Sequence, residues 1–88
     1  MPRLSNKSNL ESESILIGIG PSGEVYMAGQ RVGLFSLRAL VEHKLKSNPK
    51  LSTILVADKA VSAELVVRVM DELRLSGVRR IALATRKK

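Results

Sequence analysis

Hydrophobic side chains recur with two different periods along residues 15–85, and this alternation constrains the fold more than any other feature. Strand-like patterns, with apolar residues at every second position or in a short continuous run, occupy residues 15–19, 25–28, 53–57 and 80–85. Helical spacing of apolar residues fills the two longer intervals, residues 34–46 and 63–76. The sequence therefore predicts six elements in the order ββαβαβ.

Turn and capping residues mark the ends of these elements. Pro21-Ser22-Gly23 supplies a hairpin turn between the first two strands, because proline presets φ and glycine accepts a positive φ. Ser62 is expected to cap the second helix, and Gly77 has the position of the left-handed residue that ends it. The expected buried stripe of the first helix is Leu34, Leu37, Leu40, Val41 and Leu45, and that of the second is Leu65, Val66, Val69, Met70 and Leu73.

Strand-helix-strand connections of this length join parallel strands through right-handed crossovers, so both helices should cover the same face of one sheet. We expect an α+β fold, a two-layer α/β sandwich in which two helices pack on one face of a four-stranded mixed sheet. The opposite face would carry Leu16, Gly18, Tyr26 and Ala82. A partly apolar, uncovered face is either a dimer surface or simply a thin one.

The 88 residues leave room for one domain. Residues 1–14 are rich in serine and asparagine and lack apolar periodicity, so we expect a flexible leader or linker there and a domain at residues 15–88. Tyr26 and Phe35 are the only aromatic residues, so aliphatic side chains and methionine must build the core. There is no cysteine, and no apolar run approaches the roughly 20 residues that a membrane helix needs.

The formal net charge is +7, and all of it lies after residue 14. An excess of this size favours polyanionic partners such as nucleic acid, anionic lipid headgroups or an acidic polymer. Solvated faces explain most such charges, and an anion-binding surface is the alternative. Its candidate residues are Arg38, Lys44, Lys46, Arg68, Arg79 and Arg80, with Lys50 and Arg74 in the same two groups around the helices.

Three patterns that resemble catalytic or ligand-binding motifs have simpler explanations. Residues 18–23 match the spacing GxGxxG, but a strand rather than a helix follows, so we interpret them as a hairpin turn. His43 is the only histidine and has no cysteine or second histidine with which to share a metal. Ser36 and Ser76 have no convincing base partner. We therefore expect no catalytic residue, no metal, no cofactor and no enzymatic activity.

Several motifs, taken in their order, resemble the periplasmic domain of the ExbD/TolR family, somewhat closer to ExbD. The apolar run ends in Ala57-Asp58, Val61 follows, and the second helix contains Val69-Met70-Asp71 before the Gly77-Val78 turn. The resemblance covers residues 15–85. The family-motif positions, structural or partner-binding, are Pro2, Gly23, Tyr26, Ala57, Asp58, Val61, Met70, Asp71, Leu73, Gly77 and Leu83.

The resemblance implies a domain that belongs to a bacterial inner-membrane protein and lies in the periplasm. Family members have an N-terminal membrane helix, which this chain lacks, so the chain resembles an excised soluble domain. The essential aspartate of that helix matches no residue here, and Asp58 is not that residue. A Leu-Pro motif follows the helix in the family, and Met1-Pro2-Arg3 is the candidate remnant of it.

The implied role is that of a coupling subunit without chemistry of its own. Such a subunit dimerises within an ExbB/TolQ-type channel and uses the proton motive force to move a TonB- or TolA-type protein. ExbD-like members energise TonB-dependent transport of iron-siderophore complexes and vitamin B12 across the outer membrane. TolR-like members maintain the envelope and can bind peptidoglycan, an acidic polymer that would suit the basic charge.

A small basic RNA-binding module is the main alternative. It fits the net charge, but sheet platforms that bind RNA place several aromatic side chains among the charges, and Tyr26 alone is a poor platform. We therefore expect no nucleic-acid partner. A small enzyme is the third hypothesis, and the absence of a recognisable polar constellation disfavours it.

Overall fold

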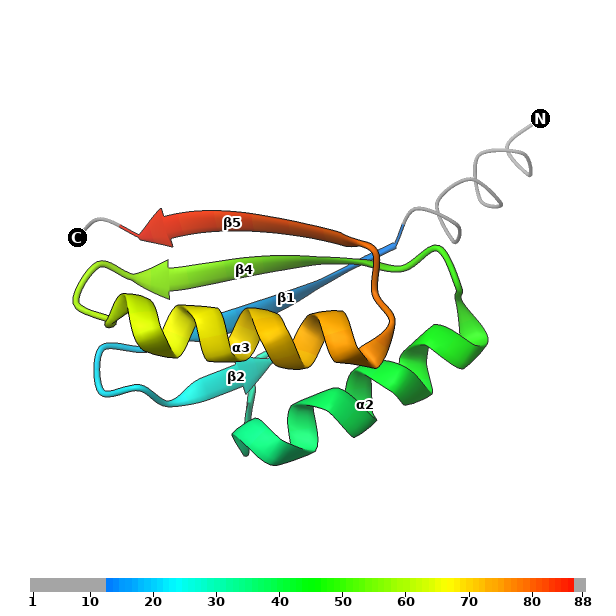
Figure 1. Ribbon diagram of the computed structural model, residues 1–88, viewed down its shortest axis with the longest axis horizontal. Coiled ribbons are helices and arrows are strands. Elements are labelled where there is room, and N and C mark those ends of the chain that lie inside the picture. Colours follow the sequence, from blue (N-terminus) through cyan, green and yellow to red (C-terminus); the bar gives the residue numbers. More distant parts are fainter. Residues whose placement is uncertain (1–12, 87–88) are drawn as a thin grey trace.

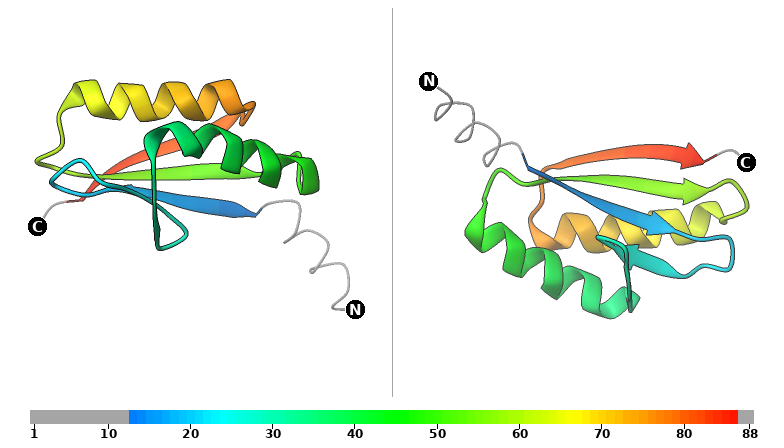
Figure 2. Two further views of the ribbon diagram at one scale, coloured as in Figure 1. Left: turned by 90° about the horizontal axis from the view of Figure 1, so that it is seen from below. Right: turned by 180° about the vertical axis from the view of Figure 1, so that it is seen from behind.

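The computed structural model describes residues 13–86, which form one sheet with two helices packed on one of its faces (Figures 1 and 2). The elements in chain order are β1 Ser14–Ile19, β2 Val25–Met27, β3 Gln30–Val32, α2 Leu34–Ser47, β4 Ser52–Asp58, α3 Ala63–Ser76 and β5 Arg80–Arg86. This arrangement confirms the expected α+β fold class.

The sheet has the spatial order β3-β2-β1-β4-β5. Strands β1, β4 and β5 run parallel, whereas β1, β2 and β3 form an antiparallel meander. The sheet has five strands rather than the four expected, because Gln30–Val32 pairs with β2 after a turn at Ala28 and Gly29. Both turn residues have positive φ, 52° and 85°. Three residues with one apolar member carry too little periodicity to be recognised as a strand.

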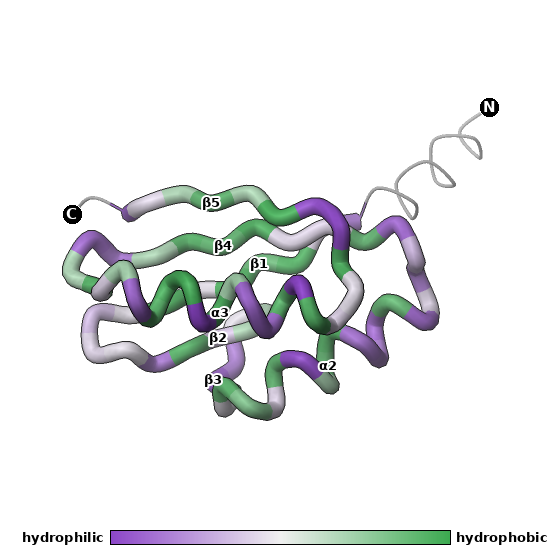
Figure 3. The backbone as a smooth tube through the Cα atoms, viewed as in Figure 1, coloured by the Kyte–Doolittle hydropathy of each residue, from purple (hydrophilic) through white to green (hydrophobic). Residues whose placement is uncertain are grey.

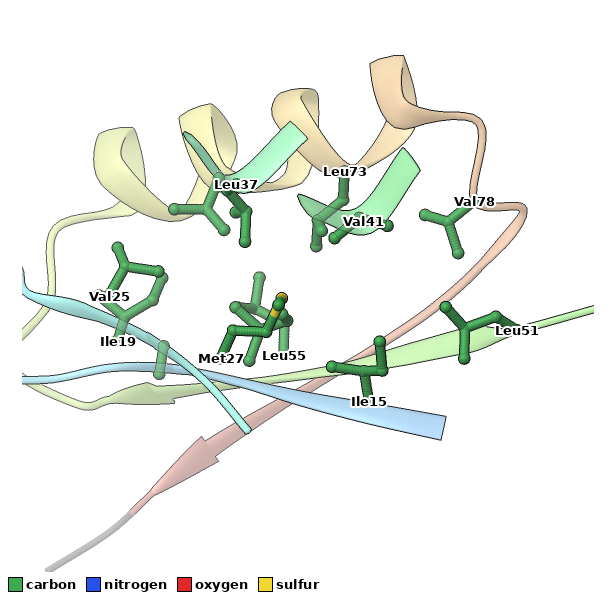
Figure 4. Packing of buried hydrophobic residues seen from close by; sticks show 13 residues of the cluster. Ile15, Ile19, Val25, Met27, Leu37, Val41, Leu51, Leu55, Leu73 and Val78 are labelled. Atoms are coloured by element: carbon green, nitrogen blue, oxygen red, sulfur yellow. The ribbon is translucent and has the colours of Figure 1, made fainter. Parts of the chain in front are cut away.

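The hydrophobic core fills the space between the helices and the sheet (Figure 4). Leu37, Val41 and Leu73 point from the helices toward the strands, where Ile15 and Leu55 meet them (Figure 4). The core is aliphatic apart from Met27, as the shortage of aromatic residues requires. The residues with less than 2% exposure are Ile17, Leu37, Val41, Thr53, Leu55, Val69 and Leu73.

The capping residues behave as the sequence predicts. The hydroxyl of Ser62 accepts a hydrogen bond from the Leu65 amide at 3.2 Å and so caps α3. Gly77 ends the same helix in the left-handed conformation with φ 102°, which residues with a Cβ rarely adopt. Helix α2 ends at Ser47, one residue later than expected, immediately before Asn48 and Pro49.

Two sequence-based expectations need correction. Leu40 is exposed and does not belong to the buried stripe of α2, because Leu37 and Val41 already face the sheet. Ser14, assigned to the leader, is the first residue of β1, and the backbone carbonyl of Glu13 accepts a hydrogen bond from the Ser52 amide at 3.1 Å. The remaining leader, residues 1–12 with Pro2, lies outside the described residues, as do residues 87–88.

Neither described helix combines the length and hydrophobicity required to span a membrane.

Candidate interaction surfaces

Four of the family-motif positions contribute to the core. Ala57 on β4 and Leu73 on α3 are buried, and Val61 and Met70 are partly buried against the core cluster. The side chains of Ala57 and Leu73 are inaccessible to a partner, whereas those of Val61 and Met70 keep part of their surface exposed. Their positions fit a structural role.

Three further motif positions shape turns. Gly23 has φ 89° in the β1–β2 hairpin, and Gly77 ends α3. Asp58 is the last residue of β4, and its carboxylate accepts a hydrogen bond from the Ala60 amide at 2.9 Å, which closes the turn toward α3. An aspartate that bonds the backbone two residues ahead is a common turn-forming group, so Asp58 has a local structural explanation.

The GxGxxG stretch forms the hairpin that its context predicts. The Gly20 amide donates to the Glu24 carbonyl at 2.8 Å, and the Gly23 amide donates to the Gly20 carbonyl at 2.9 Å. Strand β2 follows and pairs with β1, so no helix N-terminus stands behind these glycines to hold a pyrophosphate. A Cβ on Gly20 would meet the end of the flexible Glu24 side chain, which would have to move aside.

Groups that could hold a metal do not converge. Within residues 13–86, no three histidine, cysteine, aspartate or glutamate side chains form a candidate metal cluster. His43 is exposed on α2. One carboxylate oxygen of Glu24 is buried without a hydrogen-bond partner, beside a small hollow that Tyr26 and Asp58 also line. Arg86 lines the same hollow, so the hollow combines two carboxylates and a phenol with one cation.

Within residues 13–86, no element covers the face of the sheet opposite the helices (Figure 2, right). Apolar side chains occupy its centre, among them the exposed Leu16 and Ile54. Leu16 pairs with Ile54, and Ile54 pairs with Ala82, so these three side chains form a row across β1, β4 and β5. Gly18, Val56 and Ala84 form the next row, and Tyr26 flanks it on β2. The four residues expected on this face are all there. We call it the open face.

Strand β5 is the longer free edge of the sheet. Among the described strands it pairs only with β4, so one side of its seven residues has no strand partner within residues 13–86. Leu83 is in register with the buried Leu55 yet is 52% exposed, because β5 lies beyond the cover of the helices (Figure 1). Unpaired edges of this kind are templates for an added strand. The tube coloured by hydropathy shows the apolar character of β5 between its polar ends (Figure 3).

The candidate anion-binding residues separate into two sets. Arg38 belongs to an ion pair between the helices, because its Nε donates to Glu72 Oε1 at 3.0 Å. That hydrogen bond and the charge of Glu72 raise the pKa of Arg38, so the guanidinium is engaged in holding α2 against α3. Arg68 lies near the middle of α3, roughly 12 Å along the helix from its end. Neither residue joins the others.

The other four candidates gather at one end of the molecule. Lys44 and Lys46 are in the last turn of α2, and Arg79 and Arg80 follow α3. Ser14, Ser52 and Arg80 are paired across the sheet, so both helix ends and the starts of β1, β4 and β5 lie together (Figure 1). We call this the basic end. Lys50 and Arg74 also belong to it.

Phe35 is a surface feature that the sequence analysis did not single out. It lies in the first turn of α2 and is 84% exposed, beside a hollow of about 610 Å³ that Ala39 and Leu40 also line. The helical spacing of Leu34, Leu37 and Val41 already turns position 35 away from the core, so the signal was present. Asp71 on α3 is also exposed, whereas Tyr26 on β2 is partly buried.

Comparison with known proteins assigns the chain. A family model described as Biopolymer transport protein ExbD/TolR matches residues 1–88. Biopolymer transport protein exbD2 of Vibrio cholerae is 29% identical over 86 residues, a match that covers 98% of this chain and 64% of that protein. The chain thus spans a little less than two thirds of this relative. The chain belongs to the ExbD/TolR family of biopolymer transport proteins.

Proposed function

We propose that this chain is the periplasmic domain of a coupling subunit that works with an ExbB/TolQ-type channel and a TonB- or TolA-type protein. The observation that carries the proposal is the family match over residues 1–88. The subunit would transmit motion driven by the proton motive force and would perform no chemistry. Its membrane anchor would belong to the inner membrane and precede the domain.

Two surfaces suit such a role. An extended segment of a TonB- or TolA-type partner can add to the free edge of β5, because main-chain hydrogen bonds supply affinity and side-chain pockets supply specificity. The half-exposed Leu83 lies on that strand. A second copy of the domain can cover the open face around Leu16 and Ile54, which would bury apolar area that is otherwise exposed to water. Peptidoglycan is a further candidate partner for the basic surface.

The ExbD-like role is favoured over the TolR-like role, since the chain matches a relative named exbD2. The RNA-binding alternative keeps only the net charge in its support. The second aromatic residue, Phe35, lies on α2 rather than beside Tyr26 on the open face, so the sheet offers one stacking side chain.

Gene replacement tests the proposal. Deleting the gene in the source bacterium and measuring uptake of a labelled ferric siderophore, with bile-salt sensitivity in parallel, separates the two roles. An ExbD-like subunit is required for uptake that collapses with a protonophore, whereas a TolR-like subunit is required for bile-salt resistance. Unchanged uptake and unchanged resistance in the deletion strain would refute both roles.

A further inference from the structure

Charge is distributed unevenly between the two ends of the domain. At the basic end, segments 13–14, 44–52 and 74–80 hold six cationic side chains, Lys44, Lys46, Lys50, Arg74, Arg79 and Arg80, against one carboxylate, Glu13. At the opposite end, segments 19–24, 58–64 and residue 86 hold two cations, Lys59 and Arg86, against Glu24, Asp58 and Glu64. The basic excess of the described residues is therefore concentrated at one end.

Helix dipoles explain only half of this cluster. Lysine and arginine in the last turn of a helix are stabilised by the partial negative charge there, which accounts for Lys44, Lys46 and Arg74. Lys50 and Arg79 lie in the loops beyond the helices, and Arg80 begins β5. Glu13 offsets one of the six positive charges, and its carboxylate accepts a hydrogen bond from the neutral amide of Asn48 at 3.4 Å. The ion pair that the structure shows within residues 13–86 joins Arg38 to Glu72, and neither residue belongs to the basic end.

The three cations that the helix dipoles do not explain, Lys50, Arg79 and Arg80, border a hollow with an apolar floor. The hollow has a volume of about 530 Å³ and lies where α2, the loop before β4 and the turn after α3 meet. Lys50, Arg79 and Arg80 line it together with Leu45, Pro49 and Leu51, and no described carboxylate does. A phosphate attached to a glycerol and acyl stem satisfies both parts of such a lining. Free phosphate would leave the apolar floor uncovered.

We propose that the basic end is a docking surface for anionic phospholipid headgroups, with the hollow bordered by Lys50, Arg79 and Arg80 as the place where a headgroup phosphate is held. The position at which β1 begins supports a bilayer as the occupant. Strand β1 begins at this same end, beside Ser52 and Arg80, so a membrane anchor that precedes the domain would present the basic end to the membrane. This step rests on the proposed function.

Docking would give the domain two positions relative to the membrane. Each lysine or arginine close to an anionic bilayer strengthens binding roughly fivefold, and the attraction falls off within a Debye length of about 8 Å at physiological salt. A domain held by a few such contacts can be released by a modest pull. The basic end would thus hold the domain at the membrane until a partner draws it away.

Vesicle sedimentation with the 88-residue chain tests the proposal. We expect binding to vesicles that contain phosphatidylglycerol and none to pure phosphatidylcholine. The triple variant Lys50→Gln, Arg79→Gln and Arg80→Gln should lower the partition coefficient roughly 100-fold. The matched triple Arg31→Gln, Lys59→Gln and Arg86→Gln, which removes the same charge elsewhere, should lower it less than fivefold. Thermal melting of both triples checks that they remain folded.

Other outcomes would overturn the proposal. Equal losses for the two triples would mean that net charge rather than the basic end drives binding. Free glycerol phosphate or a short RNA that binds more tightly than the vesicles, through the same three residues, would replace the bilayer as the occupant. Failure of vesicle binding leaves the uptake experiment of the proposed function unaffected, and loss of that function would leave vesicle binding unaffected, so the two can fail separately.

Discussion

Replacing Leu73 by alanine removes part of a side chain that has no exposure to solvent and points from α3 into the core (Figure 4). Leucine-to-alanine changes at buried sites cost about 2–5 kcal/mol, the sum of lost transfer free energy and the cavity left behind. The core here is a single thin layer between two helices and a sheet, which can partly collapse. We therefore expect a loss of about 2–4 kcal/mol in the free energy of unfolding.

Urea denaturation followed by far-ultraviolet circular dichroism measures this loss. With a slope of about 1 kcal/mol per molar urea for a small domain, the midpoint should fall by roughly 2–4 M. Because a domain of this size has only about 4–13 kcal/mol of stability, the variant lies close to unfolding. Leu73→Met keeps the volume and should cost less than about 1.5 kcal/mol, which provides a folded companion.

Leu75→Ala is the matched control, because it makes the same change two residues later in the same helix. Leu75 is 59% exposed, so the expected effect is within about 0.5 kcal/mol. The change in helix propensity, which slightly favours alanine, is common to both variants and cancels in the comparison. Equal effects at the two positions would mean that α3 presents a different face to the sheet and that the packing described above is wrong.

Three further predictions address turns, caps and the sheet edge. Gly77→Ala should cost about 1–2 kcal/mol in the same urea assay, because φ is 102° there. Gly18 lacks a positive φ, and an added Cβ would make only an ordinary contact with the Val56 carbonyl oxygen at 4.0 Å, so Gly18→Ala should change stability by less than about 0.5 kcal/mol. Ser62→Ala should cost about 1 kcal/mol through loss of the cap on the Leu65 amide, and an unchanged midpoint would contradict that role. Leu83→Lys should leave the melting temperature unchanged yet abolish energised siderophore uptake, while Val67→Lys on the exposed face of α3 should retain uptake.

The order of elements was predictable because each element carries its own period. Residues 15–19 alternate, and the two helices have stripes at helical spacing with Ser62 and Gly77 at the ends of the second. Strand β3 was not predictable. It is only three residues long, and its pairing depends on two consecutive positive-φ residues that turn the chain back. Local periodicity contains no signal for such an element.

The exposure of side chains at the edges of the two layers was harder to predict than the burial of the core. Periodicity tells which side of its own element Leu40 or Leu83 occupies, but the extent of the neighbouring layer decides whether that side is covered. Leu83 shares a row with the buried Leu55 and is nevertheless half exposed, because β5 lies outside the helical layer. The exposure of an edge strand is a property of the assembled layers.

The grouping of cations at the basic end also depends on the assembled fold rather than on local sequence. The sequence groups the cations by helix, with Arg38 beside Lys44 and Arg68 beside Arg79. The fold groups them by end, since parallel crossovers bring the C-terminal ends of both helices together with the starts of β1, β4 and β5. Arg38 and Arg68 are left out for this reason. The ββαβαβ order already implied this regrouping.

Site-specific photo-crosslinking in living cells tests the central claim, that this domain works by docking its exposed sheet surfaces under control of the proton motive force. A photoreactive residue at Leu83 should form crosslinks to a partner protein and one at Leu16 should form crosslinks to a second copy of the domain, and a protonophore should abolish or change those crosslinks. A photoreactive residue at the exposed Glu42 of α2 serves as the control and should form none. Crosslinks from Leu83 and Leu16 that are absent, or identical with and without the protonophore, would contradict the claim.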